Sequence, residues 1–191
     1  MYSRLQEIFD QQKANMQHLT EAGYLEAVSE VIDVQVEALK KGKKVLIAGN
    51  GGSAADAQHF AGEFVGRFLK ERAGLPAIAL TTDSSVLTCV ANDYGYDKVI
   101  SRQIEALGNE GDVFIGISTS GNSENIIEAV NEAKKRGIIT VGLLGKDGGK
   151  LAEICDYVML VSLQETPRVQ EFHTMTVHMM CEMVEEKMFE D

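Results

Sequence analysis

The chain has 191 residues, of which 45% are hydrophobic, and a formal net charge of −11. This length suits a single domain, residues 1–191, with a sizeable core. The acidic balance argues against nucleic acid as the main partner, because neutralising its phosphates requires clustered Lys and Arg. The net charge does not exclude a small anionic substrate, since a few oriented N–H groups can hold one phosphate.

Two amphipathic helices are expected within residues 1–42. Apolar residues recur at helical spacing from Leu5 to Met16 and again from Leu25 to Leu39, and the second pattern ends at Lys41. Neither helix carries obvious chemistry. We expect them to cover an exposed face of the following sheet or to pack against a second copy of the chain.

In residues 43–191, patterns typical of strands and helices alternate. Strands are predicted at residues 45–48, 77–80, 113–117, 138–144 and 157–161. Helices are predicted at residues 54–68, 84–91, 97–107, 126–136, 149–154 and 167–189. This alternation predicts the α/β class, with a doubly wound, five-stranded parallel sheet of flavodoxin-like order and helices on both faces.

Two loops follow the first and third predicted strands, which are neighbours in a flavodoxin-like sheet. The first loop, residues 50–53, reads Asn-Gly-Gly-Ser, and its glycines let the backbone approach a ligand closely. The hydroxyl loop, residues 118–123, reads Ser-Thr-Ser-Gly-Asn-Ser. Ligands bind where the strand order of such a sheet reverses, so both loops are expected to face one crevice.

The hydroxyl loop has the composition of a phosphate site. It opens a helix, so free N–H groups and the positive end of the helix dipole face the loop. Serine and threonine also cap helices and fill turns without binding anything. Three serines, one threonine and one glycine within six residues after a buried strand favour the phosphate interpretation.

Candidate reactive side chains lie on two helices. His59 and Glu63 are four residues apart, so they share a helix face and suit either metal binding or proton transfer. An exposed His–Glu pair without a role is an equally weighted alternative. The last helix adds Gln170, His173 and His178, of which His173 is expected to be a buried histidine with satisfied ring nitrogens.

Targeting and redox signals are absent from the sequence. Cys89, Cys155 and Cys181 form no C-x-x-C pair and are predicted to be reduced, buried thiols. No apolar run approaches the roughly 20 residues of a membrane span, and no leader pattern precedes the first helix. A cytoplasmic protein is expected.

Taken together, these segments resemble the bacterial phosphoheptose isomerases of the sugar isomerase (SIS) superfamily. The motifs are G-N-G-G-S, H-F-A-G-E, A-N-D-Y-G, G-I-S-T-S-G-N-S, G-K-D-G-G and R-V-Q-E-F-H-T-M-T-V-H. The resemblance implies an SIS-type sheet with two N-terminal helices and a cytoplasmic homotetramer with active sites between subunits. It also implies conversion of sedoheptulose 7-phosphate to D-glycero-D-manno-heptose 7-phosphate, the first step towards the ADP-heptose of the lipopolysaccharide core.

The same resemblance assigns roles to individual residues. The residues implied to hold the phosphate are Ser53, Ser118, Thr119, Ser120 and Ser123. The residues implied to contact the substrate are Asn50, Gly51, Gly52, Asn92, Asp93 and Gln170. One zinc ion per site is implied, with the ligands His59, Glu63, Gln170 and His178.

Glu63 and His178 also match the family's proposed base and acid, which an aldose–ketose interconversion through an enediol requires. A zinc-bound carboxylate is a weaker base, so whether the metal organises the site or takes part in catalysis stays open. Gln170 and His178 are also eight residues apart, about 12 Å along a continuous helix. Either the helix is not straight at Gln170 or the two residues serve different protomers' sites, and we predict that at least one site draws residues from two chains.

Two other functions fit parts of the sequence. The superfamily includes non-enzymatic proteins that bind a replication initiator protein, but that group lacks the residues matching Glu63 and His178. The presence of both residues therefore favours an enzyme. The other function is that of an isomerase of another phosphosugar, which the loop composition does not exclude.

Overall fold

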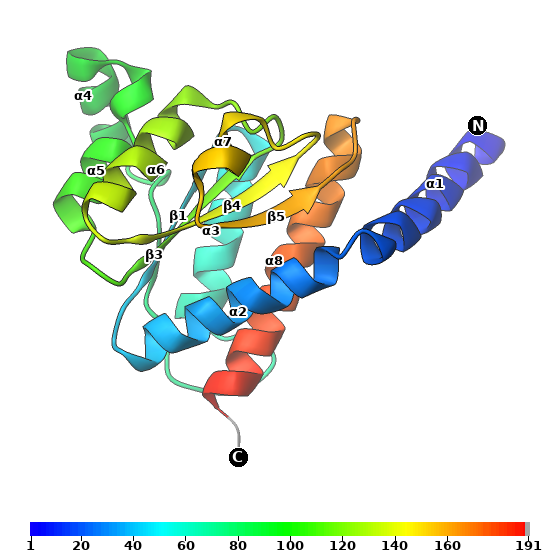
Figure 1. The fold of residues 1–191 in the computed structure, drawn as a ribbon, viewed down its shortest axis with the longest axis horizontal. Helices are drawn as coiled ribbons and strands as arrows, with labels where there is room; N and C mark the ends of the chain where they lie inside the picture. Colours follow the sequence, from blue (N-terminus) through cyan, green and yellow to red (C-terminus); the bar gives the residue numbers. More distant parts are fainter. Residues whose placement is uncertain (190–191) are drawn as a thin grey trace.

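A five-stranded parallel sheet forms the centre of the computed structural model, which describes residues 1–189 (Figure 1). The strands are β1 (Val45–Gly49), β2 (Ala77–Ala79), β3 (Val113–Ser118), β4 (Ile139–Gly145) and β5 (Tyr157–Val161). Their order is β2-β1-β3-β4-β5, and every neighbouring pair is parallel. The predicted flavodoxin-like order is confirmed, with the reversal between β1 and β3.

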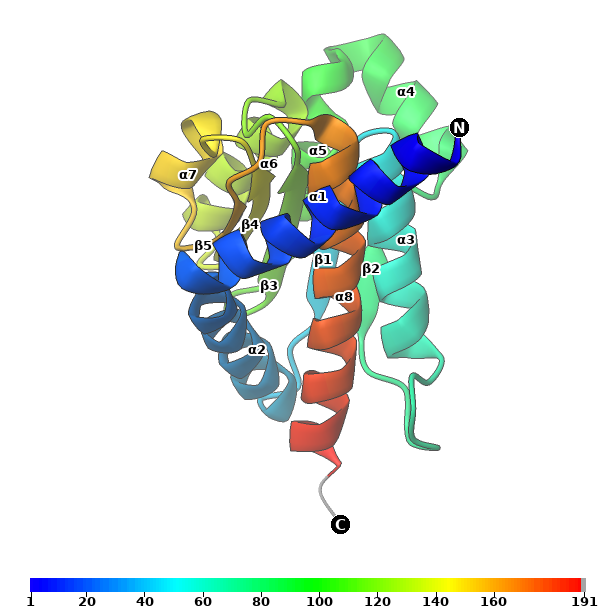
Figure 2. The same ribbon diagram turned by 90° about the vertical axis from the view of Figure 1, so that its right-hand side faces the viewer.

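Helices cover both faces of this sheet, as predicted (Figures 1 and 2). The helices are α1 (Tyr2–Glu21), α2 (Tyr24–Lys40), α3 (Gly52–Val65), α4 (Ser84–Tyr94), α5 (Ser101–Leu107), α6 (Glu124–Lys135), α7 (Gly149–Ile154) and α8 (Thr166–Met188), with a 3₁₀ turn η1 (Tyr96–Lys98). Apolar residues of α2, α3 and α8 form one core with the sheet, and those of α5, α6 and α7 form the other. Because successive strand side chains point to opposite faces, Ile47 enters the first core and Leu46 the second.

The two N-terminal helices differ in their packing. Helix α2 buries residues such as Val28 and Val36 against the sheet, so its expected covering role is confirmed. Helix α1 extends away from the sheet (Figure 1) and leaves Tyr2, Leu5 and Phe9 between 56% and 79% exposed. Packing of α1 against a second copy of the chain stays a prediction.

Several predicted boundaries are wrong at the ends of helices. The helix predicted at residues 54–68 begins at Gly52 and ends at Val65, because the N–H of Phe68 donates to the Glu185 carboxylate and not to a helical carbonyl. The helix predicted at residues 97–107 divides into η1 and α5. Helix α4 continues to Tyr94, beyond the predicted end at residue 91, and Gly95 stops it at φ 95°.

The prediction of three buried thiols is correct only for Cys181. Cys155 is half-buried and Cys89 is exposed, while all three are free thiols. Cys89 lies on α4, a peripheral helix without a buried residue, so its apolar spacing does not correspond to burial. Among residues 1–189, no helix has the length and hydropathy needed to span a membrane.

Candidate functional site

The first loop and the start of α6 are linked by a pair of side-chain amides. Asn50 and Asn125 each donate from Nδ2 to the other's Oδ1, at 2.9 Å in both directions. The Tyr96 hydroxyl donates to Asn50 Oδ1 at 3.0 Å. The two loops at the switch point are therefore neighbours, as the strand order predicts.

The hydroxyl loop, residues 118–123, is folded around its own side chains. The hydroxyls of Ser118 and Ser123 share a hydrogen bond of 2.9 Å, and the N–H of Asn122 donates to Ser120 Oγ at 3.2 Å. Ser123 is the N-cap of α6 but makes no side-chain capping bond. The N–H groups of Glu124 and Asn125 in the first turn of α6 therefore remain available to an anion, whereas that of Ile126 donates to the carbonyl oxygen of Ser123 at 3.0 Å.

Gly121 allows this loop to pack against the segment after β4. Its φ is 65°, and a Cβ at this position would lie 1.9 Å from the carbonyl oxygen of Gly148. Its own carbonyl accepts the N–H of Leu151 at 3.0 Å. The loop thus has a fixed conformation that only glycine permits at this residue.

Helices α3 and α8 meet along a polar seam. Gln170, Thr174 and His178 are four residues apart on α8 and face α3 in that order. A Cβ on Gly52 would lie 2.8 Å from Gln170 Nε2, so Gln170 sits against the first loop. Further along, Thr174 Oγ1 donates to Asp56 Oδ1 at 2.9 Å.

The far end of the seam holds an acid–base cluster, which consists of His59, Glu63 and His178. His59 Nε2 lies 3.0 Å from Glu63 Oε1 and 3.3 Å from His178 Nε2. The side chains of His59 and Glu63 are 39% and 29% exposed, so the cluster is accessible to solvent. The ring of Phe68 packs against His178 with centroids 5.8 Å apart.

The four residues implied as zinc ligands are not all together in one chain. Helix α8 is continuous from Thr166 to Met188, so the alternative of a broken helix at Gln170 is wrong. Gln170 is therefore separated from His178 by about 12 Å along the axis. Within residues 1–189, no group of three or more His, Cys, Asp or Glu side chains is placed to hold a metal ion.

Part of the donor set nevertheless fits zinc. The 3.3 Å between the Nε2 atoms of His59 and His178 matches two ligands of one tetrahedral zinc ion, for which about 3.3 Å is expected. Two imidazoles and a carboxylate are also donors that zinc prefers. One chain thus brings two imidazole donors to the spacing of zinc ligands, while Glu63 reaches only His59.

Within residues 1–189, the side chains of Asn92 and Asp93 make no hydrogen bond to either loop. Both are exposed on α4, and Asn92 Nδ2 donates to Asp93 Oδ1 at 2.8 Å. The side chain that reaches the first loop from this region is that of Tyr96, just after α4.

Sequence reasoning missed Asp56, Thr174, Tyr96 and Asn125. Asp56 is half-buried under Thr174, and this burial raises its pKa, against the opposing effects of the Thr174 hydrogen bond and of His59. Weak signals exist, since Asp56 precedes His59 by three residues and Thr174 lies midway between Gln170 and His178. Only the packing of α3 on α8 gives these spacings a meaning.

The interpretation of His173 is half correct. The residue is fully buried, and Nε2 donates to the carbonyl oxygen of Leu144 at 3.1 Å, but Nδ1 has no partner among residues 1–189. Burial lowers the pKa of His173 to about 4, although the bond to Leu144 opposes this shift. The imidazole is therefore neutral at ordinary pH.

Comparison with known proteins shows the family to which the chain belongs. The family model of the SIS domain matches residues 7–145, so the doubly wound sheet and its hydroxyl loop are those of an SIS domain protein. The phosphoheptose isomerase of Aneurinibacillus thermoaerophilus is 55% identical over 171 residues, which cover 90% of this chain and 86% of the relative.

Solved structures show the same relationship. The phosphoheptose isomerase from Neisseria gonorrhoeae superposes with a TM-score of 0.91 at 41% identity, and the one from Francisella tularensis with a TM-score of 0.93 at 34% identity. Each comparison covers 97% of this chain and 98% of the other. The chain belongs to the phosphoheptose isomerases of the SIS domain family and is a sugar phosphate isomerase.

Proposed function

We propose that this isomerase converts sedoheptulose 7-phosphate to D-glycero-D-manno-heptose 7-phosphate. The observation that carries the proposal is the acid–base cluster, in which Glu63 and His178 both approach His59 on the seam that begins at the first loop. The substrate is that implied by the sequence motifs, and the named relatives are phosphoheptose isomerases.

Different residues bind the phosphate, transfer the proton and orient the sugar chain of the substrate. The serines and Thr119 of the hydroxyl loop, Ser53 and the N–H groups of α6 bind the phosphate. Glu63 takes the proton from carbon, while His178 serves the sugar oxygens, so the proton moves between adjacent carbons through an enediol. Asn50 and Gln170, together with the backbone of Gly51 and Gly52, orient the sugar chain, and Asn92 and Asp93 contact it from α4.

Zinc is proposed as the metal of this site, held by His59, Glu63 and His178 with Gln170. The spacing of the two imidazole nitrogens and the donor types support it. When bound, zinc would supply a Lewis acid that polarises sugar oxygens. Elemental analysis of purified protein tests the assignment without reference to activity: wild type should retain one zinc per chain, and His59→Ala should lose it.

The resemblance of the sequence motifs also supports a proposal for the assembly and the setting. We propose a single-domain cytoplasmic subunit that forms a homotetramer and supplies lipopolysaccharide core biosynthesis. The exposed apolar side chains of α1 support self-association, as does an apolar groove of about 350 Å³ between α2 and α8 beside Leu25 and Met183.

The decisive experiment incubates purified protein with sedoheptulose 7-phosphate and measures the aldose product. Turnover is expected, and other ketose phosphates should be converted more slowly. Absence of product both with and without added zinc would contradict the proposal. Faster turnover of a different phosphosugar would instead identify an isomerase of that sugar.

A further inference from the structure

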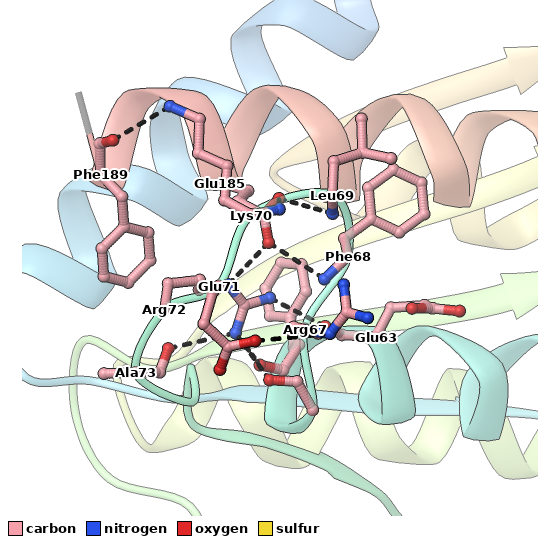
Figure 3. Close-up of polar contacts among 12 residues, drawn as sticks. Glu63, Arg67, Phe68, Leu69, Lys70, Glu71, Arg72, Ala73, Glu185 and Phe189 are labelled. Carbon is pink, nitrogen blue, oxygen red and sulfur yellow. Dashed lines mark hydrogen bonds and ion pairs between the residues drawn. The ribbon is translucent and has the colours of Figure 1, made fainter. Parts of the chain in front are cut away.

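Arg72 and Glu185 form a buried ion pair next to the acid–base cluster (Figure 3). Their side chains are 2% and 1% exposed, and Arg72 Nε donates to Glu185 Oε2 at 2.7 Å. Charges buried to this extent persist only when hydrogen bonds satisfy them. The partners of these two side chains show what the pair holds in place.

Arg72 binds the end of the helix that carries Glu63. Its guanidinium donates to the carbonyl oxygens of Glu63 at 2.9 Å and of Phe64 at 2.7 Å, and also to that of Gly66 at 3.2 Å. These are carbonyls that the end of a helix leaves without a helical partner. The guanidinium therefore fixes the main chain of Glu63 itself.

Glu185 binds the loop that follows this helix. Its carboxylate accepts the successive N–H groups of Phe68, Leu69 and Lys70, at 3.0, 2.7 and 2.6 Å. Burial alone would raise the pKa of Glu185, but the three N–H groups and Arg72 outweigh it and hold the pKa below its usual range. The carboxylate is thus ionised and anchors the loop to α8.

The two halves of the network meet at the reacting groups. Glu185 lies seven residues after His178 on α8, two turns along the same face. Phe68, held by Glu185, packs its ring on His178. The main chain of Glu63 is therefore connected to α8 through Arg72 and Glu185, and the ring of His178 is supported from the same loop.

We propose that Arg72 and Glu185 are positioning residues, which set Glu63 and His178 at the distance that proton transfer requires. The proposal rests on the proposed isomerase function for its kinetic consequence. Proton transfer depends strongly on geometry, and small misplacements lower the turnover number more than substrate binding. The hydroxyl loop lies on other elements, β3 and α6, so phosphate binding does not depend on this pair.

A matched control exists at the amino end of β3, the central strand of the sheet. Asp112 is also 1% exposed, pairs with Lys44, and accepts the N–H groups of Lys44 and Asn109. It contacts no residue of the acid–base cluster. Asp112→Asn therefore removes a comparable buried carboxylate without disturbing the site.

The test compares Glu185→Gln with Asp112→Asn in the full-length protein. Glu185→Gln should lower kcat about 10- to 100-fold with KM for sedoheptulose 7-phosphate near the wild-type value, because the reacting groups move but the phosphate site does not. Asp112→Asn should lose similar stability in urea and keep kcat. If Glu185→Gln does not fold, Arg72→Lys replaces it in the test. This substitution keeps the positive charge but removes the guanidinium N–H groups that donate to the α3 carbonyls.

A second readout is independent of turnover. The imidazole NMR signals of His59 and His178 should shift in Glu185→Gln and in Arg72→Lys, and stay in place in Asp112→Asn. Equal kcat losses in the matched variants, or unmoved imidazole signals, would overturn the positioning role. If wild type does not convert the sugar while the signals still shift, the proposed function fails and the positioning role stands.

Discussion

Glu63 is the residue on which the proposed chemistry depends most directly. Glu63→Gln keeps the shape and the contact with His59 but removes the base, so turnover should fall by at least about 100-fold, as is usual for a lost general base. Folding and substrate binding should be retained. Turnover and binding of sedoheptulose 7-phosphate, measured by product assay and calorimetry, check this, and retained activity would exclude Glu63 as the base.

Ser120 should show the opposite behaviour. Ser120→Ala removes one hydroxyl from the hydroxyl loop, so binding of substrate should weaken by a factor of roughly 10, the value of one hydrogen bond to a charged group. Chemistry at the far end of the sugar should change little. Calorimetric titration with substrate measures the loss, and an unchanged affinity would remove Ser120 from the phosphate shell.

His173 should make stability depend on pH. Its pKa is lowered from 6.5 to about 4, so below pH 6.5 the unfolded chain takes up a proton that the folded chain refuses. The stability from this residue is complete above pH 6.5 and falls as the pH drops towards 4, by up to about 3 kcal/mol. Urea unfolding at several pH values measures it.

A non-titrating variant provides the control for His173. His173→Gln keeps a donor for the carbonyl of Leu144 and should show a smaller loss of stability between pH 6.5 and pH 4. His18→Gln, at an exposed position, should follow the wild-type curve. Parallel curves for wild type and His173→Gln would contradict the neutral, buried imidazole.

At the scale of residues, the sequence predicts which side chains are reactive better than it predicts which side chains contact each other. Residues such as His59 and Glu63 are visible from their spacing on one helix, and the structure does bring them within 3.0 Å. Asp56 and Thr174 are 118 positions apart and gain their contact only from helix packing. A pattern within one helix therefore cannot reveal them.

At the scale of elements, the contact between the hydroxyl loop and the loop after β4 makes a prediction for Gly121. Gly121→Ala places a Cβ 1.9 Å from Gly148 O at a φ of 65°, so both collision and strain destabilise the protein. We expect the free energy of unfolding to fall by well above the roughly 1–2 kcal/mol that the strained backbone alone would cost. Phosphate binding should also weaken.

Gly42→Ala is the matched variant for this prediction. Gly42 has a φ of 71°, but nothing lies within 4 Å of the added Cβ. The free energy of unfolding of Gly42→Ala should fall only by the cost of the strained backbone, about 1–2 kcal/mol. The variant should bind substrate normally. Urea unfolding separates the two, and equal losses would show that the loop contact is unimportant.

The end of α3 shows why element boundaries escape the sequence. Helical periodicity continues to Phe68, but the chain leaves the helix after Val65 because Glu185, distant in sequence, and Arg72, eight residues beyond Phe64, offer better partners for its backbone. Such partners are known only after folding. The strands, buried on both faces, are instead predictable from local composition, because each forms a short apolar run.

At the scale of the molecule, the strand order and the meeting of the two loops follow from the α/β alternation. The eight-residue spacing of Gln170 and His178 is also visible in the sequence, but only the continuity of α8 makes it a separation along one helix axis. Gln170 lies against the first loop, whereas the acid–base cluster lies about 12 Å further along α8. One chain thus presents the substrate-holding half and the reacting half of the site at different ends of the seam.

This separation predicts that a complete site takes its two halves from two chains. Gln170→Ala disables the first half and Glu63→Gln the second, so each variant alone should be inactive. When the two are unfolded together and reassembled, about a quarter of the sites in randomly mixed, symmetric oligomers should combine two intact halves. A mixture of Glu63→Gln with His178→Ala is the control, because both residues belong to one cluster and no chain in this mixture has an intact second half. We expect activity in the first mixture and none in the control. If neither mixture recovers activity, each site is built within a single chain.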